Sequence, residues 1–243
     1  AYDLVIVVMR RNQTRSILPA LAANKCIPSV LFLLNNAAGP GEWVEALGKN
    51  RVLIGLPNTG GEKRGNVVHY LLKDSFTISF NELDETKTAR VDQIIQMFQS
   101  AHLSAAAQIH VDAYLKTHIA LVAPAASAIY MAGGDVHRLA HMHESLILLV
   151  RAIREGFKVL RTRDIPITPP AMKILDWIPE RMLAFLLRML FSTEMAVTAM
   201  ERHANAAPDE MKELTDQFRA LINQSGISTP SSNALYKYVD SHP

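Results

Sequence analysis

The chain has 243 residues, of which 49% are hydrophobic and 20% are charged, and this composition excludes a disordered polypeptide, a collagen-like rod and a disulfide-stapled miniprotein. The 25 Lys and Arg residues against 23 Asp and Glu residues give a net charge of +2, and no basic run alternates with aromatic residues, so charge gives no case for nucleic-acid binding. The single cysteine, Cys26, cannot form an internal disulfide, which fits a reducing compartment.

The chain opens directly on an apolar run. The β-branched residues of Leu4–Met9 predict a strand that is covered on both faces. No basic segment precedes the run and no small-residue cleavage site follows it, so it does not match a secretory signal. Because the domain begins on such a strand, we expect the sequence to be a fragment from which an upstream segment is missing.

The first third of the sequence alternates strands and helices. Strands are predicted at Leu4–Met9, Val30–Leu34 and Val52–Leu56, with helices at Ile17–Leu21 and Glu42–Leu47 between them. These spacings imply right-handed crossovers and a parallel sheet. Two further strands, Val67–Leu72 and Phe76–Phe80, are predicted to join this sheet in antiparallel fashion, and an amphipathic helix is predicted over Val91–Phe98.

From about Ile109 onward the pattern is helical throughout. Helices are predicted over Ala113–Met131, Val136–Phe157, Ala171–Leu175, Arg181–Met200, Glu210–Ile222 and Ser232–Val239, with breaks at glycine and proline. The sequence therefore predicts an α/β domain over residues 1–108 and an all-helical domain over residues 109–243. The uncharged stretch Thr117–Gly134 is near the lower length limit for a membrane span, but its alanines, its histidine and its proline favour a buried core helix.

One lysine stands out on the first of these helices. Lys116 is followed by the apolar residues Ile119, Leu121 and Val122. A lysine at the edge of an apolar helix usually reaches into solvent, whereas a lysine desolvated in a cleft is suited to general acid catalysis. The residues alone favour the first interpretation.

The order of several short motifs resembles the ketopantoate reductase (2-dehydropantoate 2-reductase) family. They are Tyr2–Val8 with Arg10 and Gln13-Thr14, Val30–Asn35, Arg51–Gly55, Arg64–His69, Tyr114-Leu115-Lys116 and Gly226–Pro230. The resemblance spans nearly the whole chain but begins partway into the first domain of the family. It implies a partial Rossmann-type domain whose N-terminal βαβ unit is missing, followed by an all-helical domain for substrate binding and dimerisation.

The resemblance also implies a chemistry. NADP would deliver a hydride to the carbonyl of an α-keto acid or a related small molecule, as in pantothenate biosynthesis, in a cytoplasmic enzyme that forms a homodimer and has neither a nucleic acid nor a membrane as partner. The residues carried over are Lys116 as proton donor, Glu210 as active-site glutamate, Arg10, Gln13 and Asn35 at the cofactor, and Thr198 at the substrate.

The sequence departs from the family at the substrate and at the cofactor. The family's substrate-binding asparagines fall on Ala120 and Pro124, which cannot offer an amide, and a third falls near Gly134. No G-x-G-x-x-G turn for the pyrophosphate is present. A non-catalytic homologue that keeps the fold as a binding or assembly protein is therefore the alternative.

A third hypothesis is a metal-dependent enzyme. His137, His141 and Glu144 would share one face of a continuous helix, so that two imidazoles and a carboxylate could bind one metal ion. Such a pattern more often marks a polar helix face at the surface, and we expect no metal.

The apolar stretch Met182–Phe191 is expected to lie in the core or at a dimer interface, and Trp43 and Trp177 are interpreted as packing residues.

Overall fold

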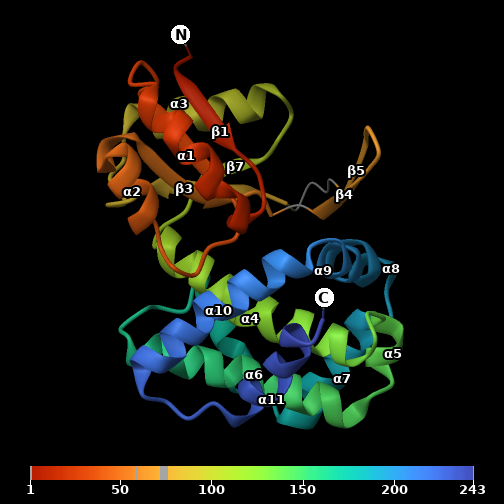
Figure 1. Ribbon diagram of the computed structural model, residues 1–243. Coiled ribbons are helices and arrows are strands. Elements are labelled where there is room, and N and C mark those ends of the chain that lie inside the picture. The colour runs from red at the N-terminus through yellow and green to blue at the C-terminus, as the bar shows by residue number, and fades with distance from the viewer. Residues whose placement is uncertain (1, 59, 72–75, 243) are drawn as a thin grey trace. The chain divides into compact units, whose positions relative to one another are not determined.

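The computed structural model describes residues 2–58, 60–71 and 76–242 (Figure 1). The chain forms two compact units, the first from Ala1–Asn58 and Lys73–Leu115 and the second from Thr59–Leu72 and Lys116–Pro243. The last passage between them falls inside helix α4 (Val111–Met131), directly before Lys116.

The first unit is built on a five-stranded mixed sheet in the order β1-β2-β3-β6-β7. Its strands are β1 (Leu4–Val7), β2 (Ser29–Leu33), β3 (Val52–Leu56), β6 (Ile78–Glu82) and β7 (Ala105–Ala107). The first three strands run parallel, β6 is antiparallel to β3, and β7 is parallel to β6. The remaining elements are η1 (Arg11–Gln13), α1 (Thr14–Ala23), α2 (Gly41–Leu47), η2 (Lys49–Arg51) and α3 (Ala89–Ser100).

Helices cover both faces of this sheet. Alternate residues of β2, among them Phe32, pack against α1, α2 and the start of α4, and Phe32 stacks on Trp43 with 4.2 Å between ring centroids. The intervening residues, among them Leu31, pack against α3 on the other face. Because β2 and β3 are buried along their whole length, the apolar runs predicted the two central strands correctly.

Two predictions about strands are wrong. Leu4–Met9 does not form a strand covered on both faces: β1 ends at Val7, pairs with β2 alone among the described strands, and leaves Ile6 and Val8 exposed. Val67–Leu71 (β5) pairs with Gly60–Arg64 (β4) in a separate hairpin of the second unit instead of joining the five-stranded sheet. The last residue of that predicted strand, Leu72, lies outside the described residues, as do Thr59 and 73–75.

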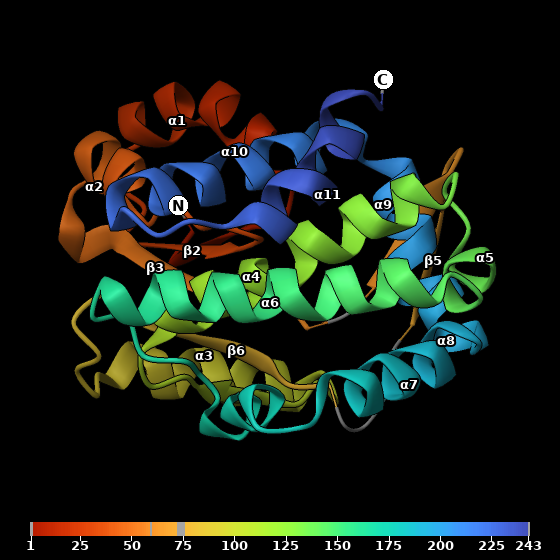
Figure 2. The ribbon, with the colours of Figure 1, turned by 90° about the horizontal axis from the view of Figure 1, so that it is seen from below.

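The second unit is helical apart from this hairpin. After α4 come α5 (Val136–Ala140), α6 (His143–Thr162), η3 (Pro170–Asp176), α7 (Glu180–Phe191), α8 (Glu194–Ala196), the π-helical turn η4 (Val197–Glu201), α9 (Arg202–Ala206), α10 (Pro208–Ser225) and α11 (Pro230–Asp240). Figure 2 shows α6 as the long central helix, and α7, α10 and α11 pack against it.

Helix α4 is the buried core helix that its sequence predicts. Ala120 is 1% exposed, and a Cβ added to Gly156 of α6 would lie 3.2 Å from the Ala120 Cβ. Pro124, four residues on, has no N–H to bond the Ala120 carbonyl, and Gly156 lies close to that carbonyl. The two helices approach closely here because both positions lack a bulky side chain.

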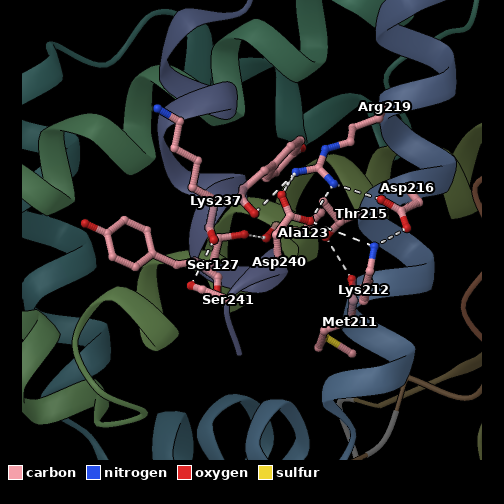
Figure 3. A network of polar contacts seen from close by, with 12 residues as sticks. Ala123, Ser127, Met211, Lys212, Thr215, Asp216, Arg219, Lys237, Asp240 and Ser241 are labelled. Atoms are coloured by element: carbon pink, nitrogen blue, oxygen red, sulfur yellow. Dashed lines mark hydrogen bonds and ion pairs between the residues drawn. The ribbon is translucent and has the colours of Figure 1, made fainter. Parts of the chain in front are cut away.

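A charged network joins α10 to α11 (Figure 3). The Arg219 guanidinium donates to Asp240 at 2.6 and 2.8 Å and to Asp216 at 2.8 Å, and Lys212 donates to Asp216 at 2.7 Å. The hydrogen bonds that Arg219 donates to Asp240 lower the pKa of Asp240, and the bonds that Asp240 and Asp216 accept raise the pKa of Arg219. The network fixes the last helix of the chain on the helix that carries Glu210.

Two predicted helices are interrupted. Val136–Phe157 breaks at His141 and Met142, between α5 and α6, and Arg181–Met200 breaks after Phe191, where the Thr193 hydroxyl caps the next turn. Neither break has a glycine or a proline to mark it.

In the described part of the chain, no single helix is long and apolar enough to cross a membrane. One bent pair of helices, Glu180–Phe191 with Glu194–Ala206, reaches the length and apolar composition of a membrane span when the two are taken together.

Candidate functional site

A buried polar cluster lies where β1 and β2 end in the first unit. Arg11, only 2% exposed, donates to Glu42 and to Thr14 at 2.9 Å each and to Asn36 at 3.4 Å. Its guanidinium carbon lies 5.2 Å from the centroid of the Trp43 ring. The carboxyl ends of parallel strands are the usual place for a ligand in an open α/β sheet, so this cluster marks the candidate cofactor edge.

Two asparagine atoms at this edge are buried without a hydrogen-bond partner in the described part of the chain. The Asn36 side chain is 0% exposed, and its Oδ1 accepts from Ala38 N at 3.2 Å while its Nδ2 has no hydrogen-bond partner among the residues that the structure describes. The Oδ1 of neighbouring Asn35 is also buried and unpartnered. A buried amide normally finds a partner, so an unsatisfied donor and an unsatisfied acceptor on consecutive residues point to a ligand with complementary groups.

The buried arginine gives a stability prediction. We expect Arg11→Ala to lower the free energy of unfolding by about 2–3 kcal/mol, because it removes a buried guanidinium that hydrogen-bonds to Glu42, Thr14 and Asn36. Arg15→Ala is the matched control: Arg15 binds the same Glu42 at 2.9 Å, but it is 69% exposed, so its loss is expected to cost at most about 1 kcal/mol. Equal losses in urea denaturation would contradict this assignment.

The same pair predicts a pH dependence. Burial by itself would raise the pKa of Glu42, but the hydrogen bonds and charges of Arg11 and Arg15 outweigh it and lower that pKa below its ordinary value of 4.5. Because the folded-state pKa is lowered, the stabilisation is complete above about pH 4.5 and is lost as the pH falls through the folded-state value. Arg11→Ala is therefore expected to flatten the acid limb of the stability curve.

Helix α4 is anchored in the first unit just before its lysine. The Tyr114 hydroxyl donates to Asn58 Oδ1 at 2.7 Å, and Asn58 Nδ2 donates to the Thr77 carbonyl at 2.6 Å and to Ser79 Oγ at 3.2 Å. Burial raises the pKa of Tyr114, so the hydroxyl keeps its proton. The aromatic residue of the Tyr114-Leu115-Lys116 motif thus fixes the first turn of the helix.

Lys116 is buried in the second unit. It is 8% exposed, which rules out the solvent-reaching lysine favoured by the residues alone. Glu210, in the first turn of α10, is 3% exposed, and the helix N-terminus stabilises its negative charge. His203 Nε2 of α9 lies 3.7 Å from Glu210 Oε2. The second unit therefore contains both a buried lysine and a buried glutamate.

The other residues that the resemblance names are more exposed than Lys116 and Glu210. Arg10, half-buried, and Gln13, exposed, bracket the turn η1, with Gln13 N bonded to the Arg10 carbonyl at 3.0 Å. Asn35 is half-buried beyond the end of β2, and Thr198 is half-buried in the π-helical turn η4. Arg10, Gln13 and Asn35 belong to the first unit, and Thr198 belongs to the second with Lys116 and Glu210.

The metal hypothesis is not supported. His137 lies in α5, His141 ends that helix and Glu144 lies in α6, so the three side chains do not share a face of one helix. The His141 Nδ1 lies 2.8 Å from the His137 carbonyl. Among the residues that the structure describes, no group of three His, Cys, Asp or Glu side chains is placed to hold a metal ion.

No family model and no curated protein matches the sequence, but solved structures match it over nearly its whole length. A D-mandelate dehydrogenase complex with NADH superposes with a TM-score of 0.77 at 14% identity, covering 99% of this chain and 78% of that chain. The chain has the ketopantoate reductase fold. A ketopantoate reductase from Staphylococcus aureus, described as dimeric, gives 0.74 at 13% identity over 99% and 77%, and a 2-dehydropantoate 2-reductase from Geobacter metallireducens gives 0.76 at 13% over 98% and 76%.

Sequence reasoning missed Arg11 and Asn36. It placed the cofactor residues on their neighbours Arg10 and Asn35, although Arg11 and Asn36 are the buried members of each pair. The signal was present in the paired residues Arg10-Arg11 and Asn35-Asn36, each directly after a predicted strand. A pair of like residues at such a turn does not reveal which member faces inward.

Proposed function

We propose that the protein is an oxidoreductase with a nicotinamide dinucleotide cofactor that reduces the carbonyl of an α-keto acid or a related small molecule. The observation that carries the proposal is a lysine, Lys116, 8% exposed on a core helix in a chain with the fold of ketopantoate reductases. A buried lysine is a suitable proton donor because its ammonium group carries transferable protons into a site from which water is largely excluded.

The roles that we propose for the residues are those that the family resemblance implies. Lys116 protonates the alkoxide that forms at the reduced carbon, and Glu210, a buried carboxylate, orients and stabilises the ammonium group. Thr198 contributes a hydroxyl toward the substrate. Ala120 packs against Gly156 and offers no amide, so we expect the substrate to differ from ketopantoate in its polar contacts.

The residues at the ends of β1 and β2 fit the nicotinamide half of the cofactor. When bound, that group supplies the hydride. The unpartnered Asn36 Nδ2 and Asn35 Oδ1 offer one donor and one acceptor, which complement the two polar atoms of a carboxamide, and Arg10 and Gln13 follow β1 at the same edge. NADP is the cofactor that the family resemblance favours, and the single cysteine fits the reducing conditions of the cytoplasm.

A titration with reduced cofactor tests this proposal. We expect full-length protein to enhance the fluorescence of NADPH, and of NADH more weakly, and to oxidise the bound cofactor when α-keto acids are added. Binding of the cofactor without its oxidation by any of a panel of keto acids would favour the alternative hypothesis, a non-catalytic binding or assembly protein. That alternative is supported by Ala120 and Pro124, which stand where the resembled family has substrate-binding asparagines. Absence of cofactor binding would contradict the proposal outright.

We further propose that α7 joins two copies of the protein in a homodimer. Its residues Met182, Phe185, Leu186 and Met189 recur at helical spacing and are 42–57% exposed, although such side chains are usually buried. Trp177, predicted to be a packing residue, is 85% exposed just before α7, whereas Trp43 is buried as predicted. The occupant we favour is a second copy, because one matching ketopantoate reductase is described as dimeric.

The dimer proposal predicts the effect of two charges on α7. We expect Phe185→Glu with Met189→Glu to convert the dimer to a monomer in sedimentation velocity, because each carboxylate would be desolvated in an apolar interface. Met97→Glu is the matched control, since Met97 is 41% exposed on α3 of the first unit. A monomeric wild-type protein, or a dimer that survives both charges, would contradict the proposal, and binding of wild-type protein to lipid vesicles would assign the face to a membrane surface instead.

A further inference from the structure

A histidine pair lies next to the buried glutamate of the second unit. His203 Nε2 of α9 lies 3.7 Å from Glu210 Oε2, and the charge of His203 contributes to a lowered pKa of His118 on α4. The Glu210 side chain is 4% exposed whereas that of His203 is 37% exposed. An imidazole that reaches both solvent and a buried carboxylate can compensate the charge of that carboxylate when it is protonated.

His203 is held in place by contacts on both sides of it. Glu201 Oε2 accepts from Val136 N at 2.9 Å, the Tyr130 hydroxyl donates to the Ala204 carbonyl at 2.6 Å, and Asn205 Nδ2 donates to the Gly134 carbonyl at 2.8 Å. The π-helical turn η4 comes directly before α9, and such turns are frequent at functional sites. The segment that carries His203 is therefore fixed to the end of α4 and to the turn after it.

The two imidazoles are not equivalent. Burial, and secondarily the charge of His203, lowers the pKa of His118 to about 4, so His118 is neutral at physiological pH. It is the imidazole of His203 that lies near Glu210, with 3.7 Å between His203 Nε2 and Glu210 Oε2. Neither side chain forms a metal site with its described neighbours.

We propose that His203 is a positioning residue that holds the Glu210 carboxylate by charge. The proposal rests on the function proposed above, in which Glu210 orients the ammonium group of Lys116. Without a cation at position 203, the buried carboxylate is compensated less well and its position relative to Lys116 is less restricted. His203 itself transfers nothing to the substrate.

Kinetics of two variants at position 203 test the requirement for a cation. We expect His203→Gln to lower kcat by about tenfold with little change in KM, the loss expected for one partly exposed ion pair, and His203→Lys to restore most of that loss. His137→Gln, a change of an exposed histidine in α5, serves as the control and is expected to keep wild-type kcat. If His203→Lys is as slow as His203→Gln, or if neither variant is slowed, the proposal is wrong.

A second measurement does not depend on turnover. Nuclear magnetic resonance titration of the imidazole protons is expected to show that the pKa of His118 rises from about 4 in His203→Gln, because a neighbouring positive charge is removed, and stays low in His203→Lys and His137→Gln. No rise in His203→Gln would overturn the electrostatic part of the proposal. If the pKa of His118 rises in His203→Gln but Lys116 variants turn over normally, the electrostatic effect of His203 is confirmed and the proposed function is wrong.

Discussion

Replacing Lys116 by glutamine is expected to lower kcat by roughly 10²–10⁴-fold and to leave the Kd for the reduced dinucleotide essentially unchanged. Glutamine keeps most of the aliphatic stem that packs in this buried position, 8% exposed in the wild type, but it cannot supply a proton. The effect should therefore fall on the chemical step and not on binding of the cofactor.

A matched variant separates this effect from a general one. Lys158 lies exposed on α6 of the same unit, and Lys158→Gln is expected to retain wild-type kcat. Circular dichroism and thermal melting of both variants exclude misfolding as the cause. Wild-type turnover in Lys116→Gln would remove Lys116 from the mechanism, and equal losses in both variants would show that the effect is not specific to the buried lysine.

The largest effect on stability is expected at Gly55. Gly55 of β3 pairs with Phe80 of β6, where the sheet changes from parallel to antiparallel. A Cβ at position 55 would lie 2.7 Å from the Phe80 Cα and closer still to the Phe80 Cβ and the Ser79 carbonyl, so the backbone of one strand would have to move. We expect Gly55→Ala to lower the free energy of unfolding by about 3 kcal/mol or more.

The control for Gly55 is another glycine with free space around it. A Cβ at Gly41, the first residue of α2, meets no atom within 4 Å, so Gly41→Ala is expected to change stability by no more than about 0.5 kcal/mol. Urea denaturation of the two variants gives the comparison. A Gly55→Ala protein as stable as Gly41→Ala would show that β3 and β6 do not approach as closely as the structure has them.

The central strands and most helices could be predicted from sequence because local patterns determine them. The apolar runs Val30–Leu34 and Val52–Leu56 have a side chain buried on each face, and the period of α3 places Val91 on the sheet. The hairpin could not be assigned in this way, since the residues of β5 pair with β4 and not with β6 through backbone contacts that carry no sequence signature. The exposed edge of β1 likewise follows from its having one neighbour, which an apolar run does not indicate.

The candidate site was predictable only in part. A resemblance singled out Lys116 and Glu210, and the structure finds both buried, which composition and spacing could not have shown. Arg11 and Asn36 were missed because burial at a turn depends on tertiary packing, here on Trp43 and Glu42. The helix that would have joined His137 to Glu144 ends at a break without glycine or proline, so periodicity alone overextended it.

The most direct test of the account follows the hydride. The full-length protein is incubated with NADPH or NADH deuterated at the transferable C4 position and with a panel of α-keto acids, and the products are examined by mass spectrometry. The account predicts a 2-hydroxy acid that carries one deuterium at C2, formed in equal amount to the cofactor oxidised and lost in Lys116→Gln. Recovery of the keto acids unchanged, or of a product whose C2 carries only solvent hydrogen, would contradict it.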